Sequence, residues 1–364
     1  MKILQRYILK ELAVSFILSL LIFTFVMFIG NIIKLAELVI IKGIEISYVG
    51  RLFIYLLPYL LNYTIPMAVL TGTLLTFGRL SSDNEIVALK AIGFNLFSIL
   101  LPVVTFGLVL SLFSIMLNDQ IIPRAHFATR QLLAEIGTKK PAALLEEGTF
   151  IKTFKGYIIF VQEINGNKLK NIRIYQPQKE RPTRTIIAER GEFIPLPEKK
   201  TVALKLINGS SDEPNLENPG SFYKLNFKTY YLTLDLAAQL AKKNIQKKPK
   251  DMTINELINE TKKLKQSRIN TSPLTREIHK KLSLSFASFV FVLIGLPLAL
   301  LTRRGETTIG FGLSLGVIMI YYLFLMVVEA LAMKGKFNPA LCMWSPDILI
   351  AAAGIILFCL VVER

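Results

Sequence analysis

Six long apolar stretches dominate the pattern of hydrophobic and polar positions along the chain. Each is close to the length of about 20 residues that a helix needs to cross a hydrocarbon core. They run over Leu12–Ile33, Leu52–Phe77, Leu96–Leu117, Leu282–Leu301, Thr308–Met333 and Pro346–Val362. The first is too long for the apolar region of a cleaved signal peptide, so we interpret it as a retained span. The pattern predicts an α-helical membrane protein with six transmembrane helices, three on each side of a long polar interval.

The polar interval, from about Asn118 to Lys281, changes its period along its length. Ile122–Ile136 has a helical apolar stripe. From Gly148 onward, short runs alternate between apolar and polar residues and are rich in β-branched and aromatic side chains. These runs are Phe150–Phe154, Tyr157–Glu163, Leu169–Gln176, Thr185–Glu189, Thr201–Ile207 and Phe222–Leu234. The interval is therefore predicted to hold an inserted all-β domain, a sandwich or jelly roll.

Local signals predict the connections of this insert. Asn165–Gly166 and Asn208–Gly209 have turn chemistry, because Asn and Gly tolerate positive φ. Ala241–Lys250 reads as a basic linker. Thr253 and Glu256 have capping-box spacing and predict the start of a helix that leads back to the membrane. The expected domains are residues 1–117, 118–281 and 282–364.

Charge is unevenly distributed in this hydrophobic chain. The formal net charge is +17 on a chain with mean hydropathy +0.48, and about +13 of it lies between Asn118 and Lys281. This hydrophobicity excludes a disordered polycation and argues against a nucleic-acid-binding globule. The predicted short loops carry about 8 cations on the side of the termini and about 5 on the other side. This bias predicts cytoplasmic termini and an insert on the outer face.

The sequence lacks the usual catalytic signatures. There is no Walker A, no G-x-S-x-G and no H-E-x-x-H motif, and two Cys and two His are too few and too scattered to suggest a metal site. We expect no enzymatic activity, no cofactor and no metal. Glu329 is the one ionisable residue that we expect within the spans; it lies late in the fifth span, near the outer interface, where a cation such as Lys334 would pair with it.

The predicted cytoplasmic segment Gly78–Gly93 carries the most specific signal. Ser82 or Asp83 is placed to cap a short helix that has Glu85 in its first turn, and Gly93 would end it. Within that helix Ile86, Leu89 and Lys90 share one face. A short helix between two spans suits docking onto a soluble partner, although a capped surface helix would have the same pattern.

Several motifs of this chain resemble the LptF/LptG family, the permease subunits of the lipopolysaccharide-exporting ABC transporter. The motifs are N-E-x-V-A-x-x-A-x-G at Asn84–Gly93, R-Y-I-x-K-E at Arg6–Glu11, N-Y-T-I-P-M-A at Asn62–Ala68, H-K-K-L-S-L-S-F-A at His279–Ala287, E-A-L-A at Glu329–Ala332 with Gly335 and Asn338–Pro339, and W-S-P-D at Trp344–Asp347. Three positions depart from the family pattern: Ser285 and Asn338 each replace a usual Pro, and Asp347 replaces a usual Asn. The resemblance covers nearly the whole chain and is weakest in the β domain.

The resemblance implies a set of partners. They are a cytoplasmic LptB-like ATPase dimer, a second permease that is a paralogue or an identical chain, an LptC/LptA-like periplasmic bridge, and lipopolysaccharide. It also implies that Glu85 is the carboxylate of the coupling helix that engages the ATPase, with Arg79, Asp83 and Lys90 around it. The β domain would receive the extracted lipid and pass it to partner jelly rolls edge to edge.

Basic residues near the outer ends of the spans are candidates for binding lipid phosphates. The resemblance points to Lys34 at the outer end of the first span, with Arg51 and Arg276 as weaker candidates. An interfacial lysine that snorkels to the headgroups would give the same pattern.

Glycines in the fifth span are candidates for close helix packing. They are Gly310, Gly312 and Gly316. Their small size would permit contact with a second protomer and motion of a lateral gate, or packing inside this chain.

Two other functions remain open from the sequence. A secondary lipid carrier driven by an ion gradient would need buried ionisable residues. A membrane scaffold that anchors a β domain for envelope assembly would need no ATPase.

Overall fold

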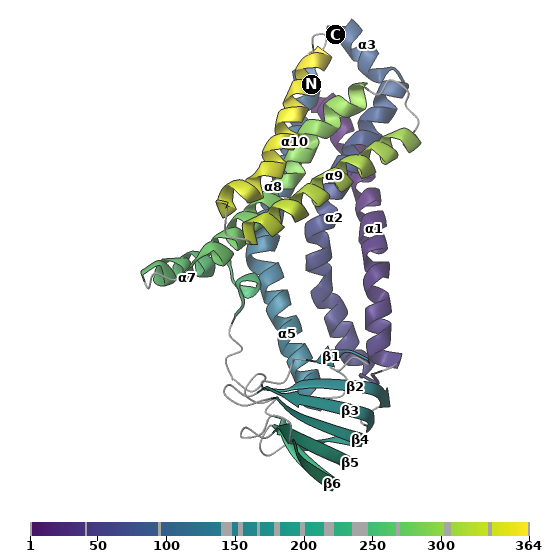
Figure 1. The fold of residues 1–364 in the computed structure, drawn as a ribbon. Coiled ribbons are helices and arrows are strands. Elements are labelled where there is room, and N and C mark those ends of the chain that lie inside the picture. Colours follow the sequence, from purple (N-terminus) through teal and green to yellow (C-terminus); the bar gives the residue numbers. More distant parts are fainter. Residues whose placement is uncertain are drawn as a thin grey trace. The chain divides into compact units, whose positions relative to one another are not determined.

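The computed structural model describes residues 2–40, 42–93, 96–139, 148–151, 156–165, 168–177, 183–196, 201–214, 222–234, 247–266, 270–301, 307–333 and 337–362. The chain forms two compact units. The first comprises residues 1–31, 55–127 and 247–364, and the second comprises residues 32–54 and 128–246. The first unit is a helical bundle and the second contains a β-sheet (Figure 1).

Among the described residues, six helices are long and apolar enough to cross a membrane, which confirms the predicted spans. They are α1 (Lys2–Ile40), α2 (Ile46–Ser82), α4 (Leu96–Met116), α8 (Ser272–Leu301), α9 (Thr307–Met333) and α10 (Pro339–Val362). A π-helical turn, Leu117–Ile121, joins α4 to α5 (Ile122–Lys139) without a break. Helix α8 begins ten residues before the predicted span, because the polar segment Ser272–Lys281 is also helical.

Helix α8 packs tightly against its neighbours in the bundle. A Cβ added at Gly354 of α10 would lie 2.7 Å from the backbone oxygen of Leu293 on α8, and one at Gly107 of α4 would lie 2.7 Å from Val292. Small residues let helix backbones approach closely where no water drives association. The buried core around these contacts includes Phe291 and Tyr321, whose rings meet edge to face.

Polar side chains also join the spans in the interior of the bundle. The Asn118 Nδ2 group, in the π-helical turn, donates to Asn62 Oδ1 at 2.6 Å and to Ser285 Oγ at 3.0 Å. Asn118, Asn62 and Ser285 are all buried. Hydrogen bonds satisfy these groups where no water can, so they link α2, the π-helical turn after α4, and α8.

The second unit confirms the predicted all-β insert. Its described strands form one antiparallel sheet in the order β1-β2-β3-β4-β5-β6, so each strand pairs with the next along the chain. The strands are β1 (Phe150–Ile151), β2 (Ile158–Asn165), β3 (Lys168–Gln176), β4 (Arg184–Leu196), β5 (Thr201–Pro214) and β6 (Phe222–Leu234). The connectivity of these strands is that of a meander.

A transverse row of polar residues creases this sheet. Asn171 on β3, Glu189 on β4 and Asn208 on β5 lie at the positions where the pairing of neighbouring strands is interrupted, and the two asparagines have φ values of 50° and 53°. Asn208 Nδ2 donates to Glu189 Oε2 at 3.4 Å, and Asn171 Nδ2 donates to Gln162 Oε1 at 3.1 Å. Asn171 and Asn208 therefore have left-handed backbone conformations that bend their strands, and their side-chain hydrogen bonds stabilise these bends.

The alternation of buried and exposed residues shifts by one position at this row. On β4 the buried residues are Ile186 and Ala188 before Glu189, and Gly191 and Phe193 after it. A strand normally keeps one phase, because successive side chains point to opposite faces. Buried residues on both sides of the row, including Ala188 and Phe193, belong to one hydrophobic cluster, so the shift keeps one continuous core along the sheet.

This crease corrects the prediction of a turn at Asn208–Gly209. The pair lies inside β5, where Gly209 is paired with Ala188 and Phe227. The positive φ of Asn208 bends the strand and does not reverse the chain. For the other predicted turn, Asn165 ends β2, whereas Gly166 lies outside the described residues.

Candidate functional site

The short helix α3 (Glu85–Ala91) follows α2 and lies at the end of the bundle that also holds the start of α1 and the end of α10 (Figure 1). Asn84, with φ of 57°, separates α2 from α3, and its carbonyl accepts the first helical hydrogen bond of α3, from Ala88 N at 2.9 Å. Gly93, with φ of 78°, follows the end of the helix as predicted. The predicted cap is wrong, because Ser82 ends α2 and Asn84 is the residue that directly precedes α3.

The two faces of α3 have different environments. Ile86 is 5% exposed and belongs to the core of the bundle, and Leu89 packs against the same core. Val87 and Ile92 are 59% and 74% exposed. The inward face therefore anchors the helix, and apolar side chains remain exposed at Val87 and, just beyond its end, at Ile92.

A polar cluster ties α3 and the end of α2 to the start of α1. The Tyr7 hydroxyl donates to Glu85 Oε1 at 3.2 Å, and Arg79 Nη2 lies 2.8 Å from Glu11 Oε2. Tyr7 and Glu11 are four residues apart, so they lie on one face of α1. Glu85 is half-buried at this contact. Of the predicted coupling residues, Glu85 and Arg79 thus have contacts on α1, Asp83 is exposed, and the side chain of Lys90 lies outside the described residues.

Tyr7 and Glu11 are members of this cluster that were not predicted from the sequence. The signal was present in the R-Y-I-x-K-E segment at Arg6–Glu11. Its pairing with α3 was not predictable, because Tyr7 and Glu85 are 78 positions apart.

The predicted lipid-binding cations lie in different units. Lys34 on α1 and Arg51 on α2 are exposed and belong to the second unit. Glu37, the acid nearest to Lys34 in sequence, pairs with Lys42 at 3.7 Å. Arg276 on α8 belongs to the first unit, and its Nε is buried without a hydrogen-bond partner among the described residues.

The glycines of α9 do not form a close internal contact. Among the described residues, a Cβ added at Gly312 or Gly316 would meet nothing within 4 Å, and one at Gly310 would make an ordinary contact of 3.6 Å with Leu74 O. Packing against the described residues therefore does not explain Gly312 and Gly316. The exposed side chains on the same helix are apolar, and they include Leu315, Met319 and Leu323.

Two findings change the expectation for ionisable residues in the spans. Glu329 on α9 is bound by Lys280 of α8, whose Nζ lies 2.7 and 2.8 Å from its carboxylate oxygens, whereas Lys334 lies outside the described residues. Asp347 on α10 is only 3% exposed. Contrary to our expectation, Glu329 is therefore not the one ionisable residue inside the spans. The sixth span was predicted to begin at Pro346, which put Asp347 at its end, but α10 begins at Pro339 and Asp347 faces the core.

Asp347 is held by hydroxyl groups from two other spans. Tyr321 OH donates to Asp347 Oδ1 at 2.9 Å, and Ser283 Oγ lies 2.5 Å from Oδ2. Ser283 Oγ also lies 2.8 Å from the carbonyl oxygen of Met343. The W-S-P-D motif marked this position in the sequence, but its burial became visible only in the packed bundle.

Comparisons with known proteins agree with this architecture. The family model "Lipopolysaccharide export system permease LptF/LptG" matches residues 6–359. The chain is 22% identical to lipopolysaccharide export system permease protein LptF of Escherichia coli strain K12 over 368 residues, which covers 98% of this chain and 94% of that protein. It is 25% identical to the uncharacterized protein RP871 of Rickettsia prowazekii over 172 residues, about half of each chain. A 110-residue segment is 27% identical to the permease LptG of Haemophilus influenzae.

Proposed function

Because the chain belongs to the LptF/LptG family of lipopolysaccharide export system permeases, we propose that it is the permease subunit of an ABC-type exporter. It is a multi-pass protein of the inner membrane. In this proposal it extracts lipopolysaccharide from the outer leaflet, and a separate cytoplasmic ATPase dimer hydrolyses ATP. The observation that carries the proposal is α3, a short helix with a buried inner face, exposed apolar residues and a carboxylate bound to α1.

Helix α3 is the element that docks the ATPase. Val87 and Ile92 supply exposed apolar surface, and Glu85 supplies a charge beside it. Interfaces of this kind combine a small apolar centre with charged groups that select the partner. In this assignment both termini face the cytoplasm, because the start of α1 and the end of α10 lie at the same end of the bundle as α3 (Figure 1).

Movement of the docked ATPase reaches the spans through two contacts. Tyr7 connects Glu85 to α1, and Glu11 connects Arg79 to the same face of α1. The exposed Arg79–Glu11 pair contributes at most about 1 kcal/mol, so its role is to orient the helices and not to stabilise the fold. A shift of α3 therefore moves the start of the first span.

The outer parts of the chain handle lipid and partners. The exposed cations Lys34 and Arg51, together with Arg276, bind lipid phosphates. Lysine binds a phosphate as a point charge, and arginine binds it through two parallel N–H donors. The glycine face of α9 contacts the second permease, because Gly312 and Gly316 leave open space toward the described residues of this chain. The creased sheet, on the periplasmic side, receives the lipid and passes it to the periplasmic bridge protein.

Asp347 provides a specific reason to keep the secondary carrier as the second candidate. Its carboxyl group is buried between three spans, where a proton-coupled carrier would place one. In that case Asp347→Asn would abolish lipid transport. In the ABC exporter the same substitution leaves transport intact.

The decisive experiment reverses the charge of Glu85. The Glu85→Lys variant, purified in mild detergent, is expected to lose the co-purifying ATPase while the chain stays folded. Glu45→Lys is the matched control, because Glu45 is an exposed carboxylate in the connection before α2. Normal lipid extraction by membranes that lack any ATPase would contradict the proposal, and would favour the carrier or a scaffold.

A further inference from the structure

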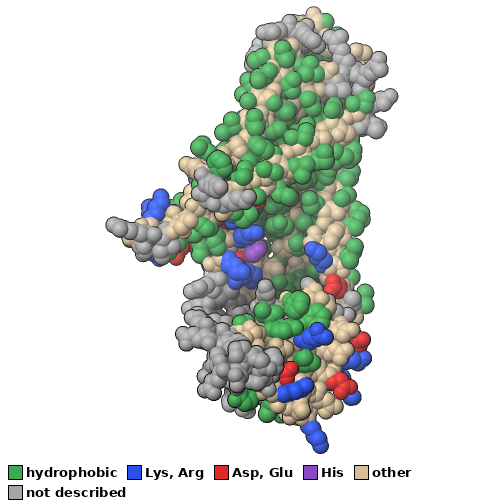
Figure 2. Space-filling model, in the orientation of Figure 1, with side chains coloured by type: hydrophobic (Ala, Val, Ile, Leu, Met, Phe, Trp, Pro, Cys, Tyr) green, Lys and Arg blue, Asp and Glu red, His purple; other side chains and the backbone are tan. Residues whose placement is uncertain are grey.

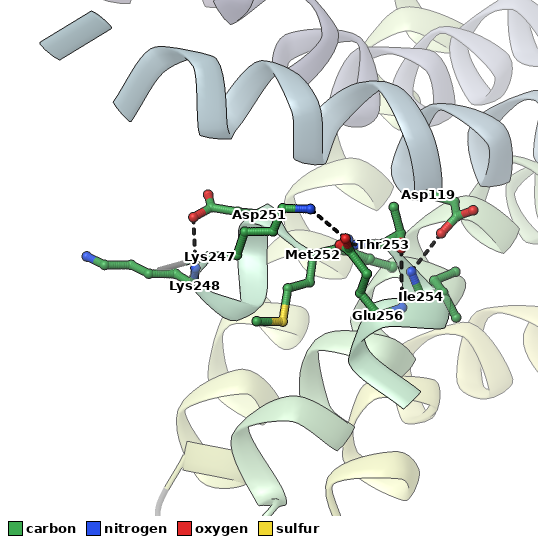
Figure 3. A network of polar contacts seen from close by, with 9 residues as sticks. Asp119, Lys247, Lys248, Asp251, Met252, Thr253, Ile254 and Glu256 are labelled. Carbon is green, nitrogen blue, oxygen red and sulfur yellow. Dashed lines mark hydrogen bonds and ion pairs between the residues drawn. The ribbon is translucent and has the colours of Figure 1, made fainter. Parts of the chain in front are cut away.

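Helix α7 (Ile254–Gln266) is firmly fixed at its first turn. The Asp119 carboxylate, from the π-helical turn after α4, accepts a hydrogen bond from Ile254 N at 2.7 Å (Figure 3). Thr253 and Glu256 form the predicted capping box, with Thr253 N 3.0 Å from Glu256 Oε2 and Glu256 N 3.2 Å from Thr253 Oγ1. Lys247 Nζ lies 2.5 Å from the same Glu256 carboxylate.

The segment just before α7 is also bound to the bundle. Asp251 is buried, and its Oδ1 lies 2.5 Å from Nδ1 of His126 on α5. Its other oxygen accepts from Lys248 N at 2.8 Å (Figure 3). Lys281 of α8 donates to the carbonyl oxygen of Met252. The start of α7 is therefore held by α5 and α8, and the direction of the helix is set.

Beyond this anchor, α7 extends sideways from the bundle, beside the start of α8 (Figure 1). The first ten residues of α8 are mostly polar, and the apolar part of the helix begins near Leu282. Helix α7 thus lies at the level where the surface of the bundle changes from polar to apolar. Basic side chains, in blue, are visible on this projection in Figure 2.

The outward side of α7 combines one apolar residue with two cations. Leu257 is fully buried. Ile258 is 38% exposed, and Lys262 and Lys265 are exposed. The spacing i, i+4 and i+7 places Ile258, Lys262 and Lys265 on one stripe of a helix.

The charge along α7 is polarised. Its two acids lie in the first two turns and are near cations: Glu256 pairs with Lys247, and Glu260 Oε2 lies 4.0 Å from Lys263 Nζ. The far end carries Lys262 and Lys265 on the same stripe as Ile258. The outward stripe is therefore cationic and partly apolar.

We propose that α7 is a membrane-surface helix, which rests on the leaflet beside the start of α8 and binds anionic phospholipid headgroups through Lys262 and Lys265. Ile258 enters the boundary between headgroups and acyl chains, and the lysine stems lie along it while their ammonium groups reach the phosphates. Each lysine strengthens this attraction to an anionic leaflet by about fivefold. The partner is the bulk anionic lipid of that leaflet, so the inference does not depend on the transported cargo.

The test uses the full-length chain in lipid vesicles that contain no lipopolysaccharide. A bimane label is placed at Ile258→Cys or, as the matched control, at Asn259→Cys, in a background with Cys342→Ala and Cys359→Ala. Asn259 is exposed and lies about 100° further around the helix. Quenching by phosphatidylcholine with a headgroup nitroxide is compared between pure phosphatidylcholine vesicles and vesicles that also contain phosphatidylglycerol.

We expect quenching at position 258 to exceed that at 259 by about twofold or more in the anionic vesicles. In pure phosphatidylcholine the excess becomes smaller, and Lys262→Glu with Lys265→Glu removes it in the anionic vesicles. Equal quenching at both positions, or an excess that survives the charge reversal, would overturn the proposal.

Two further outcomes identify other occupants and would also overturn it. An excess at 258 that requires added lipopolysaccharide would assign the helix to the cargo. A label at 258 that is shielded from aqueous iodide but not quenched by the lipid nitroxide would indicate that protein, such as a second copy of the chain, covers the stripe.

Discussion

The Tyr7 hydroxyl on α1 donates a hydrogen bond to the Glu85 carboxylate on α3 at 3.2 Å, so the first span and the proposed coupling helix share a polar contact. This contact joins residues from distant parts of the sequence at one end of the bundle. It also places the carboxylate at the edge of α3, where a docked partner would contact it.

Removal of this hydroxyl should uncouple ATP hydrolysis from lipid extraction. In Tyr7→Phe the part-buried hydrogen bond is lost, which costs about 1 kcal/mol. We expect the ATPase to remain bound but lipid extraction per ATP hydrolysed to fall by about fivefold. Reconstituted ATPase and extraction assays measure both quantities.

Tyr48→Phe is the matched control for this prediction. It also removes a tyrosine-to-glutamate hydrogen bond, from Tyr48 OH to Glu135 Oε1 at 2.9 Å, but in the other unit. An equal loss of coupling in both variants would show that the Tyr7 contact has no special role.

Asp347 is predicted to be replaceable by Asn but not by Ala. The Ser283 hydroxyl has one hydrogen and faces two acceptors, Met343 O and Asp347 Oδ2. If Asp347 Oδ2 carries a proton, it donates that proton to Ser283 Oγ, and the Ser283 hydroxyl then donates to Met343 O. Tyr321 donates to Asp347 Oδ1, so each of these groups has a hydrogen-bond partner. The amide of Asn offers the same donor and acceptor.

Thermal unfolding in detergent should therefore be nearly unchanged for Asp347→Asn. Asp347→Ala leaves the buried Tyr321 hydroxyl without its acceptor, Asp347 Oδ1, and should destabilise the chain by about 1–3 kcal/mol. If Asp347→Asn is as destabilised as Asp347→Ala, the carboxyl group is ionised and the proposed proton is absent.

The start of α7 is predicted to weaken in acid. The hydrogen bond from Lys247, followed by the backbone hydrogen bond from Thr253, lowers the pKa of Glu256 from its ordinary value of 4.5. Because the pKa is lower in the folded state, the stabilisation is fully present above the ordinary value and is lost as the pH falls through the folded value. Hydrogen exchange of the α7 amides, corrected for intrinsic rates, measures this effect.

Glu256→Gln should remove this pH dependence, and Glu260→Gln on the same helix should retain it. Thr253→Ala, which removes the other half of the capping box, should cost about 1 kcal/mol at any of these pH values. A wild-type profile that is flat between neutral pH and pH 3 would contradict the assignment.

The glycines of α9 and α10 should respond differently to added bulk. Gly312→Leu and Gly316→Leu should leave the stability of the isolated chain unchanged, because their surroundings are open, but should reduce co-purification of the second permease. Gly354→Ala should destabilise the isolated chain by about 1–3 kcal/mol, because its Cβ would meet the backbone of α8. Thermal unfolding and affinity co-purification distinguish the two effects.

Local patterns predicted the elements of this fold well. Apolar runs of membrane length identified all six spans, and the capping box at Thr253 and Glu256 forms as its spacing indicated. These features depend on residues close together in the chain, so periodicity and local hydrogen bonding are sufficient. The strand-like runs likewise gave the β insert, although the same local reasoning assigned Asn208–Gly209 to a turn.

What the sequence by itself determined is therefore the set of elements, their order and the family resemblance. Only the tertiary structure decided which polar groups meet: Tyr7 with Glu85, Lys280 with Glu329, and Asp347 with Ser283 and Tyr321. Only the sheet register showed that Asn208 lies in a crease beside Glu189. The physical reason is that a buried polar group needs a partner, and packing and register select this partner from positions far away in the chain.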